Sequence, residues 1–345
     1  MYITALKTIS PQPTYDESFF EGNHIVHSGN KYRVTEPDYT GIINPGLLRR
    51  MGKSIRIGIG AGIPLIRNRK DIDAIIIASS EGGQEESIKF LNQILDYNEG
   101  PLTPTNFIQS NPNALAGTLA LMSQNNCYNI THVHKGNAFE CSLTDASLLI
   151  EEGKAKTILV GNVEEISDYN FNIEVLAGKY KEKETSSENL LLSGTPGTVC
   201  GEGSCMFILE ASSKDYFARI GGIEQITFPT EEELHDLVRN MLAKNNLNPT
   251  DIDAIILGYN GDSRTDFWYN NLSRRIFPGQ PVNTYKNLVG EFPSSIAFAV
   301  YLGAWVISGK GSRVTGITLP GKPIRNLLIY NHYYGEQHGL ILMST

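Results

Sequence analysis

A short apolar segment that occurs twice constrains the fold of this chain most strongly. Residues 71–77 read DIDAIII, and residues 251–257 read DIDAIIL. Continuous apolar runs of this length are typical of strands in parallel sheets that helices cover on both faces. A strand, a turn and a helix follow each copy, at 129–150 and at 282–307. A repeated order of elements indicates an internal duplication, so the sequence predicts two α/β halves.

Periodicity predicts the remaining elements of both halves and places their boundary between residues 213 and 214. The first half spans 1–213 and the second half spans 214–345. Beyond the segments already named, strands are expected at the N-terminus and at 155–163, 204–210, 327–330 and 339–343. Helices are expected from residue 45 through residue 63 and at about 85–95, 111–124 and 231–245. The first contains Gly58, Gly60 and Gly62, so a frayed or broken helix is the alternative there.

The composition narrows the class of protein. Of 345 residues, 41% are hydrophobic and 19% are charged, which is typical of a globular chain. The net charge of −8 argues against a nucleic-acid-binding surface but leaves room for a local basic patch that binds an acidic partner. We expect no membrane span, no secretory signal and a cytoplasmic location. The cysteines form no C-x-x-C pair and are expected to be reduced; they are Cys127, Cys141, Cys200 and Cys205.

The segment 129–150, NITHVHKGNAFECSLTDASLLI, predicts a strand, a tight turn at 135–137 and an amphipathic helix. Such an elbow can point one residue at a ligand, beside the free N–H groups of the helix. An enzyme would place a nucleophile there, but this chain has Gly136. Lys135 and Glu140 flank the elbow, where an exposed pair at the start of the helix is the simplest expectation.

Several short motifs occur in the order found in β-ketoacyl-ACP synthases, a branch of the thiolase fold. They are LLRRM at 47–51, PNALAG at 112–117, EEG at 151–153, GEG at 201–203 with FILE at 207–210, and the turn NHYYGEQHG at 331–339. The chain resembles that family from about residue 45 onward. The resemblance implies a thiolase-like fold with five layers, α-β-α-β-α, and a dimer. It also implies an acyl carrier protein as partner, no cofactor, no metal, and a catalytic triad of one cysteine and two histidines.

The residues at the triad positions differ from those of the family. The family's cysteine falls on Gly136, its first histidine on Gly258, and its second on Glu291, five residues after Lys286. Glycine has no side chain for either task, so no catalytic site of the family kind is intact. Lys286 and Glu291 could form a structural ion pair, which we favour, or Glu291 could act as a base.

Other residues near the elbow and the closing turn are candidates for lining a pocket. His134 and Lys135 adjoin the elbow, and His332 and Tyr334 lie in the closing turn. Each histidine could equally be a core residue whose hydrogen bonds are satisfied. His332 and His338 lack a third ligand nearby, so no metal site is predicted.

Three functions remain open from the sequence. The first is a non-condensing subunit of fatty-acid or polyketide biosynthesis that resembles a chain-length factor and pairs with a catalytic ketosynthase. The second is an acyl-thioester enzyme, a malonyl-ACP decarboxylase or an acyltransferase, with chemistry relocated to His134, Lys286 or Glu291. The third is a lipid-binding scaffold that pairs with itself.

Overall fold

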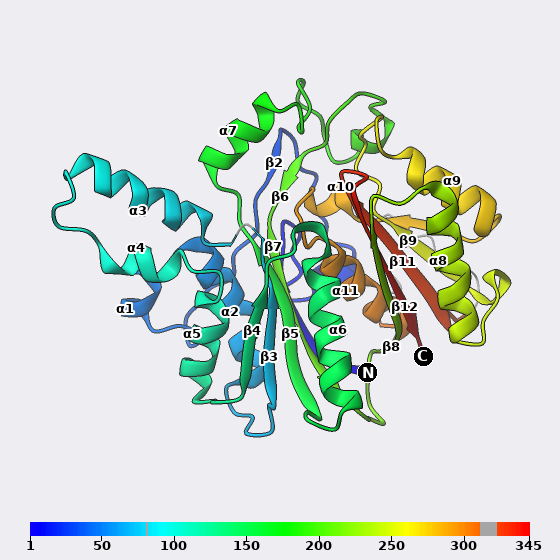
Figure 1. Cartoon of the computed structure of the whole chain (residues 1–345), viewed down its shortest axis with the longest axis horizontal. Helices are drawn as coiled ribbons and strands as arrows, with labels where there is room; N and C mark the ends of the chain where they lie inside the picture. Colours follow the sequence, from blue (N-terminus) through cyan, green and yellow to red (C-terminus); the bar gives the residue numbers. More distant parts are fainter. Residues whose placement is uncertain (81, 311–322) are drawn as a thin grey trace.

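The computed structural model describes residues 1–80, 82–310 and 323–345 (Figure 1). Within these ranges one ten-stranded sheet runs through the molecule in the order β10-β9-β11-β12-β8-β1-β7-β5-β3-β4. The strands of its first half are β1 (Tyr2–Ile9), β3 (Ala74–Ala78), β4 (Tyr128–His132), β5 (Thr157–Glu164) and β7 (Gly203–Glu210). Those of its second half are β8 (Ala218–Thr227), β9 (Ala254–Leu257), β10 (Val282–Thr284), β11 (Asn326–Tyr333) and β12 (Gln337–Ser344).

Only a short contact joins the two halves of the sheet. Tyr2 and Ile3 at the start of β1 pair with Arg219 and Ala218 of β8. Two residue pairs are therefore all that joins the two halves into one hydrogen-bonded sheet among the described strands. The predicted boundary at 213/214 falls between β7 and β8 and stays a prediction.

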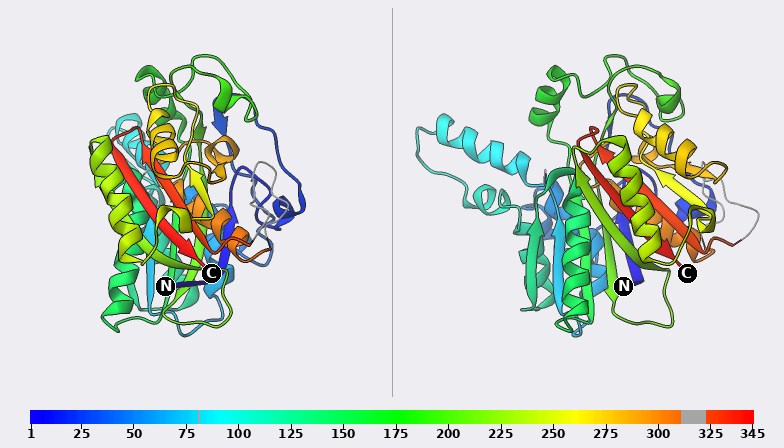
Figure 2. Two further views of the ribbon diagram at one scale, coloured as in Figure 1. Left: turned by 90° about the vertical axis from the view of Figure 1, so that its right-hand side faces the viewer. Right: turned by 45° about the vertical axis from the view of Figure 1, so that its right-hand side comes forward.

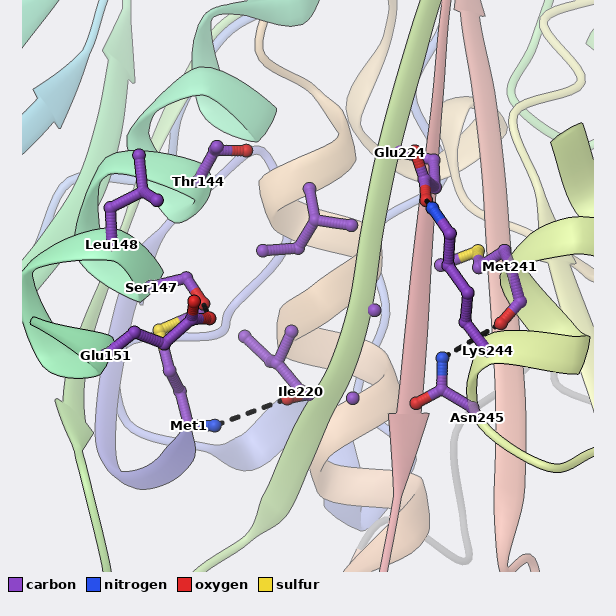
Figure 3. Close-up of a pocket in the computed structure, with 13 residues that line it drawn as sticks. Met1, Thr144, Ser147, Leu148, Glu151, Ile220, Glu224, Met241, Lys244 and Asn245 are labelled. Atoms are coloured by element: carbon purple, nitrogen blue, oxygen red, sulfur yellow. Dashed lines mark hydrogen bonds and ion pairs between the residues drawn. The ribbon is translucent and has the colours of Figure 1, made fainter.

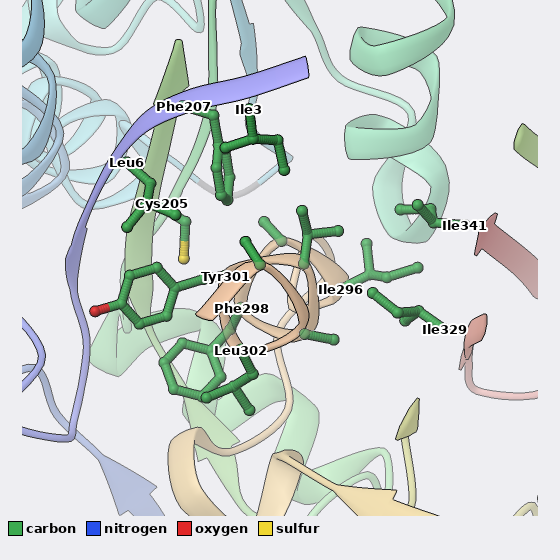
Figure 4. Close-up of a cluster of buried hydrophobic side chains, with 14 of the residues drawn as sticks. Ile3, Leu6, Cys205, Phe207, Ile296, Phe298, Tyr301, Leu302, Ile329 and Ile341 are labelled. Atoms are coloured by element: carbon green, nitrogen blue, oxygen red, sulfur yellow. The ribbon is translucent and has the colours of Figure 1, made fainter. Parts of the chain in front are cut away.

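Helices cover both faces of each half, which confirms the predicted thiolase-like arrangement. On the outer face of the first half, α2 (Lys53–Ile66) and α5 (Ala114–Ser123) pack against β3, β5 and β7. Between the halves lie α6 (Ala138–Glu151) and α11 (Ile296–Ile307), whose core includes residues of both halves of the sheet (Figures 2 and 4). On the outer face of the second half lie α8 (Glu231–Lys244) and α9 (Phe267–Ile276). All residues of α11 are buried, as expected for a helix that is apolar all round.

The repeated sequence has the same structural role in both halves. Strand β3 lies between β4 and β5, and β9 lies between β10 and β11, all in parallel. The Asp73 carboxylate accepts hydrogen bonds from the backbone of Lys156 and Thr157 at the start of β5. The Asp253 carboxylate likewise accepts hydrogen bonds from the backbone at the start of β11. This equivalence supports the proposed duplication, because both aspartates fix the register of the next strand.

The helix expected from residue 45 through residue 63 is interrupted, so that prediction was wrong. A single turn, α1 (Pro45–Leu48), ends before the separate helix α2 begins at Lys53. The glycines of α2 face neighbouring side chains: a Cβ at Gly62 would lie 2.8 Å from Cδ2 of Leu119 on α5. Close packing therefore explains why a buried helix tolerates these poor helix formers.

The remaining elements agree with the predicted ones to within a few residues where a prediction was made. They are the 3₁₀ segments 18–21, 135–137, 190–192 and 249–251, the strands β2 (Lys31–Tyr32) and β6 (Cys200–Gly201), and the helices α3 (Gln84–Asp96), α4 (Pro104–Gln109), α7 (Asp168–Leu176) and α10 (Lys286–Val289). In the part of the chain that the structure describes, no helix is long and apolar enough to cross a membrane.

Candidate functional site

The elbow lies between β4 and α6, as the sequence predicts. A 3₁₀ turn at 135–137 connects the strand to the helix, and Lys135 takes a left-handed conformation with φ of 47°. The Ser80 hydroxyl donates a hydrogen bond of 3.1 Å to the Lys135 carbonyl. A non-glycine residue in this conformation is uncommon and marks a tightly held turn. Gly136 lies just behind it and is buried.

Gly136 has no room for a side chain. An added Cβ would overlap the Cβ of Tyr333 and would lie 2.9 Å from its Cγ. In addition, the Gly136 N–H donates a hydrogen bond of 2.9 Å to Oε1 of Gln337. Two features that a nucleophile elbow would offer, space for the nucleophile and a free backbone N–H, are both occupied by the hairpin of β11 and β12.

Gly258 is equally enclosed. A Cβ there would overlap Oδ1 of Asn331 and would lie 2.7 Å from the Tyr269 hydroxyl oxygen. The same Asn331 oxygen accepts a hydrogen bond of 2.9 Å from the Tyr285 hydroxyl. A polar network thus fills the position where the family resemblance places a histidine.

Lys286 and Glu291 form a buried ion pair. Lys286 Nζ lies 2.7 Å from Glu291 Oε2, and the two side chains are 0% and 1% exposed. Lys286 also donates to the carbonyl of His332 at 3.1 Å, and the Asn260 amide donates to Glu291 at 2.7 Å. Burial lowers the pKa of Lys286 and raises the pKa of Glu291, and their mutual attraction opposes both shifts. This geometry suits a structural pair, since neither group lies in any of the hollows described below.

Glu140 is buried, so the expectation that it forms an exposed pair with Lys135 was wrong. Its side chain points into the protein against β12, where a Cβ on Gly339 would overlap Oε1 and lie 2.6 Å from Cδ. Neither carboxylate oxygen has a hydrogen-bond partner among the described groups. Burial raises the pKa of Glu140 to about 8, which favours the neutral acid at this position.

The closing-turn histidines are hydrogen-bonded core residues, and His332 lines none of the hollows described below. His332 Nδ1 accepts from the Gly335 N–H at 3.2 Å, and its Nε2 lies 3.1 Å from the Thr265 carbonyl. His338 Nδ1 lies 2.8 Å from the Tyr330 hydroxyl, and its Nε2 lies 3.1 Å from the Gly335 carbonyl. Burial lowers the pKa of both imidazoles, that of His338 to about 4. Both rings are therefore neutral, and both bind the backbone of Gly335.

Two adjoining hollows lie outside the elbow; we call them together the vestibule. Their volumes are about 340 and 480 Å³, and they share Lys135, Lys179 and Tyr333. Lys179 pairs with Glu174 at 2.8 Å, and its Nζ lies 4.7 Å from the centre of the Tyr334 ring. The other lining residues are Ser80, Gln84, Asn170, Ile173, Ala177, Asp262, Arg264, Thr265, Pro293 and Glu336. Of the four predicted pocket residues, Lys135 and Tyr334 line the vestibule, whereas His134 is exposed and does not.

A separate hollow of about 320 Å³ lies across β8, between α6 and α8 (Figure 3). Met1 lies at one end, where its amino group donates a hydrogen bond to the Ile220 carbonyl at 3.3 Å. At the other end Lys244 pairs with Glu224 at 2.8 Å. None of the residues predicted for the site lines this hollow.

Among the described residues, no group of three or more histidine, cysteine, aspartate or glutamate side chains could hold a metal ion. The site residues that the sequence did not reveal are Tyr333, Gln337 and Asn331, together with the buried position of Glu140. Tyr333 and Gln337 reach Gly136 from about 200 positions away in the sequence. A short-range pattern carries no signal for such a contact.

Comparison with known proteins identifies the fold. Residues 28–177 match the family model of the N-terminal domain of β-ketoacyl synthases. Over its full length the chain superposes on the ishigamide ketosynthase/chain length factor, with a TM-score of 0.81, 14% identity and 98% of that chain covered. The chain has the fold of the β-ketoacyl synthases. The resemblance inferred from the motifs is thereby confirmed.

Two further structures show the same fold. One is a type II polyketide synthase acyl-carrier protein in complex with its ketosynthase bound to the hexaketide, AntDE:AntF (TM-score 0.80, 14% identity, 100% of this chain and 98% of that chain). The other is a ketosynthase, ApeO, in complex with its chain length factor, ApeC, from Xenorhabdus doucetiae (TM-score 0.76, 16% identity, 100% and 97%). No curated protein sequence matches the chain.

Proposed function

We propose that this chain is a non-condensing, chain-length-factor-like subunit of a fatty-acid or polyketide-type synthase. The observation that carries the proposal is the enclosed Gly136, where Tyr333 leaves no room for a nucleophile. The enclosure of Gly258 and the ion pair of Glu291 support it, because neither position offers a free imidazole-like group.

The test is a search for an acyl-enzyme intermediate. The purified chain is incubated with acyl-ACP, and its intact mass is measured, with a Cys-His-His ketosynthase as the positive control. We expect the acyl mass increase in the control and no increase in this chain. A stable thioester on Cys141 or any other residue would refute the proposal.

We further propose that the chain pairs through the edge of its sheet at β4, with a catalytic ketosynthase as partner. Strand β4 ends the sheet order and carries neither proline nor lysine, the residues that commonly protect an edge from pairing. Large exposed apolar side chains occur on or next to this strand and on the neighbouring helices of the first half; they are Phe107, Ile108, Leu121, Tyr128 and Val133. An exposed apolar surface beside an open edge is typical of a subunit interface.

For the acyl carrier protein, we propose docking near a basic hollow of about 420 Å³. Arg49, Arg50 and Lys89 line it together with Glu86, which pairs with Lys89 at 3.0 Å, and both arginines are exposed. Positive charge concentrated on a chain of net charge −8 would attract an acidic carrier domain.

Both partner proposals can be tested by co-purification. Phe107→Asp/Ile108→Asp should abolish a stoichiometric ketosynthase complex, whereas Leu192→Asp, which changes an exposed leucine outside the proposed interface, should not. Arg49→Ala/Arg50→Ala should weaken the binding of acyl-ACP and make that binding depend less on salt concentration. Arg239→Ala is the control. A homodimer with bound lipid and no ketosynthase would instead support the scaffold function.

Relocated acyl-thioester chemistry is the weaker candidate. Lys286 and Glu291 are buried and bind each other, and His134 lies outside the vestibule. A cytoplasmic location is part of the main proposal, supported by the four cysteines, which form no disulfide with one another.

A further inference from the structure

The hairpin of β11 and β12 presents two side chains to the elbow as a matched pair. Tyr333 and Gln337 are directly opposite residues in the register of the two strands. Opposite residues in an antiparallel pair project to the same face, so the hairpin delivers both to one place. There the Tyr333 Cβ excludes any side chain at Gly136, and the Gln337 carboxamide accepts the Gly136 N–H at 2.9 Å.

The turn that carries this pair is held from several sides. Tyr334 and Gly335 both have positive φ, 52° and 70°, and the Glu336 N–H closes the turn on the Tyr333 carbonyl at 3.1 Å. His332 accepts a hydrogen bond from the Gly335 N–H, and His338 lies within hydrogen-bonding distance of the Gly335 carbonyl. Because both imidazoles engage the same residue of the turn, Tyr333 and Gln337 have little freedom to leave the elbow.

The vestibule reaches Tyr333 but neither Gln337 nor Gly136. Tyr333 lines both parts of the vestibule, and Gly136 lines neither. The buried groups Lys286, Glu291 and Glu140 line none of the described hollows. A thioester that entered the vestibule would therefore meet the Tyr333 side chain before it reached Gly136.

We infer that Tyr333 and Gln337 form an internal plug that occupies the place of an acyl thioester at the elbow and excludes acyl groups from this chain. The Gln337 carboxamide oxygen accepts the hydrogen bond of the Gly136 N–H, which the carbonyl oxygen of a thioester would otherwise accept. The inference deepens the proposed function and rests on it: if the chain shapes an acyl pocket, it does so from its surface and not by binding the thioester itself.

The test compares binding of hexanoyl pantetheine, a small acyl thioester, to three folded proteins by calorimetry. The wild-type chain should bind it weakly or not at all. The opened variant Tyr333→Gly/Gln337→Ala should bind at least tenfold more tightly, because it frees the Gly136 N–H and the space beside it. The control Tyr97→Gly removes an exposed tyrosine outside the vestibule and keeps the plug, so it should behave like the wild type.

Alkylation of an introduced thiol gives a second measurement. Gly136→Cys is added to the opened variant and treated with iodoacetamide, where the thiolate displaces iodide and forms a C–S bond. Peptide mass mapping should show faster modification at position 136 than at the native Cys141, which is half-buried on α6. If the opened variants do not fold, as judged by circular dichroism, Gln337→Ala alone frees the N–H and serves in the binding assay.

The outcomes separate this inference from the proposed function. Equal binding of the probe by wild type and opened variant would overturn the plug, as would an opened variant that neither binds nor reacts at position 136. Wild-type binding without an acyl adduct would leave the non-condensing function standing. An acyl adduct on the wild-type chain would overturn that function as well.

Discussion

The strand–turn–helix segment 282–307 of the second half is the counterpart of the elbow at 129–150, and we call its turn at Gly290 the second elbow. Both elbows carry glycine, but for different physical reasons. Gly136 in the first half is excluded from having a side chain by Tyr333 of the β11–β12 hairpin. Gly290 in the second half has φ of 79°, and a Cβ there would lie 2.7 Å from Cα of Gly201 and 2.8 Å from the Cys200 carbonyl oxygen. Glycine is required at position 136 because of one side chain, that of Tyr333. At position 290 it is required because of the backbone of its own turn and of the neighbouring β6.

The charged residues next to the two elbows also differ, because those of the second elbow are buried and that of the first is exposed. Next to Gly290 a charged pair, Lys286 and Glu291, is sealed in the core. Next to Gly136 the charged residue Lys135 is exposed at the vestibule. We therefore expect the second elbow to be essential for stability and the first to tolerate compensated changes.

The largest effect should come from removing one member of the buried pair. Lys286→Met should lower the free energy of unfolding by about 3–5 kcal/mol, because it leaves the Glu291 carboxylate buried without its counter-charge. Urea denaturation measures this loss. Lys286→Met/Glu291→Leu should recover most of it, and Lys244→Met, which breaks the exposed pair with Glu224, should cost less than about 1 kcal/mol. If the double variant is as unstable as Lys286→Met, the two side chains must stabilise the fold by more than the neutralisation of each other's charge.

Gly290→Ala should cost about 3 kcal/mol, from left-handed strain together with overlap against the β6 backbone. Gly279→Ala is the matched control, since Gly279 has φ of 101° but no atom within 4 Å of an added Cβ. That control should show the backbone strain alone, about 1 kcal/mol. Equal losses in the two variants would show that contact with β6 does not matter.

Gly136→Ala should cost about 2 kcal/mol, because the new methyl group overlaps Tyr333. Unlike the loss at Gly290, this one should be relieved in a Tyr333→Gly background. A double-mutant cycle measured by urea unfolding gives the coupling, which we expect to be at least about 1 kcal/mol. Additive losses would mean that Tyr333 can move aside, and the contrast between the two elbows would then disappear.

The sequence predicts the scaffold well because the scaffold is encoded in local patterns. The repeated DIDAII segments, the elbow at 135–137 and the apolar helix at 294–307 each carry their own periodicity, and each occurs within a few residues of its predicted place. The proposed loss of the triad follows from alignment of motifs and stays a prediction. What decides the chemistry at Gly136, however, is contact with Tyr333 and Gln337, which depends on how the two halves pack. The burial of Glu140 has the same origin, since the space that it fills exists only because residue 339 is glycine.

The smallest predicted effect concerns Glu140 and depends on pH. Burial raises the pKa of this carboxyl in the folded chain from its usual value of 4.5 to about 8. Between these values the folded chain holds a proton that the unfolded chain has lost. The stabilisation from this proton is therefore fully present below the lower value and is lost as the pH rises through the upper one. The slope is about 1.4 kcal/mol per pH unit for one group.

Glu140→Gln should remove this pH-dependent loss, so that the stability of the variant relative to wild type increases by about 1 kcal/mol between about pH 6 and pH 7. Urea unfolding at the two pH values measures the difference, with Glu151→Gln, which changes an exposed carboxyl at the far end of α6, as the control. Because the introduced amide would meet the same unpartnered surroundings, the absolute stability of the variant is less informative than this slope. Parallel slopes for wild type and variant would show that Glu140 is ionised in the folded chain and that Lys286 compensates both carboxylates.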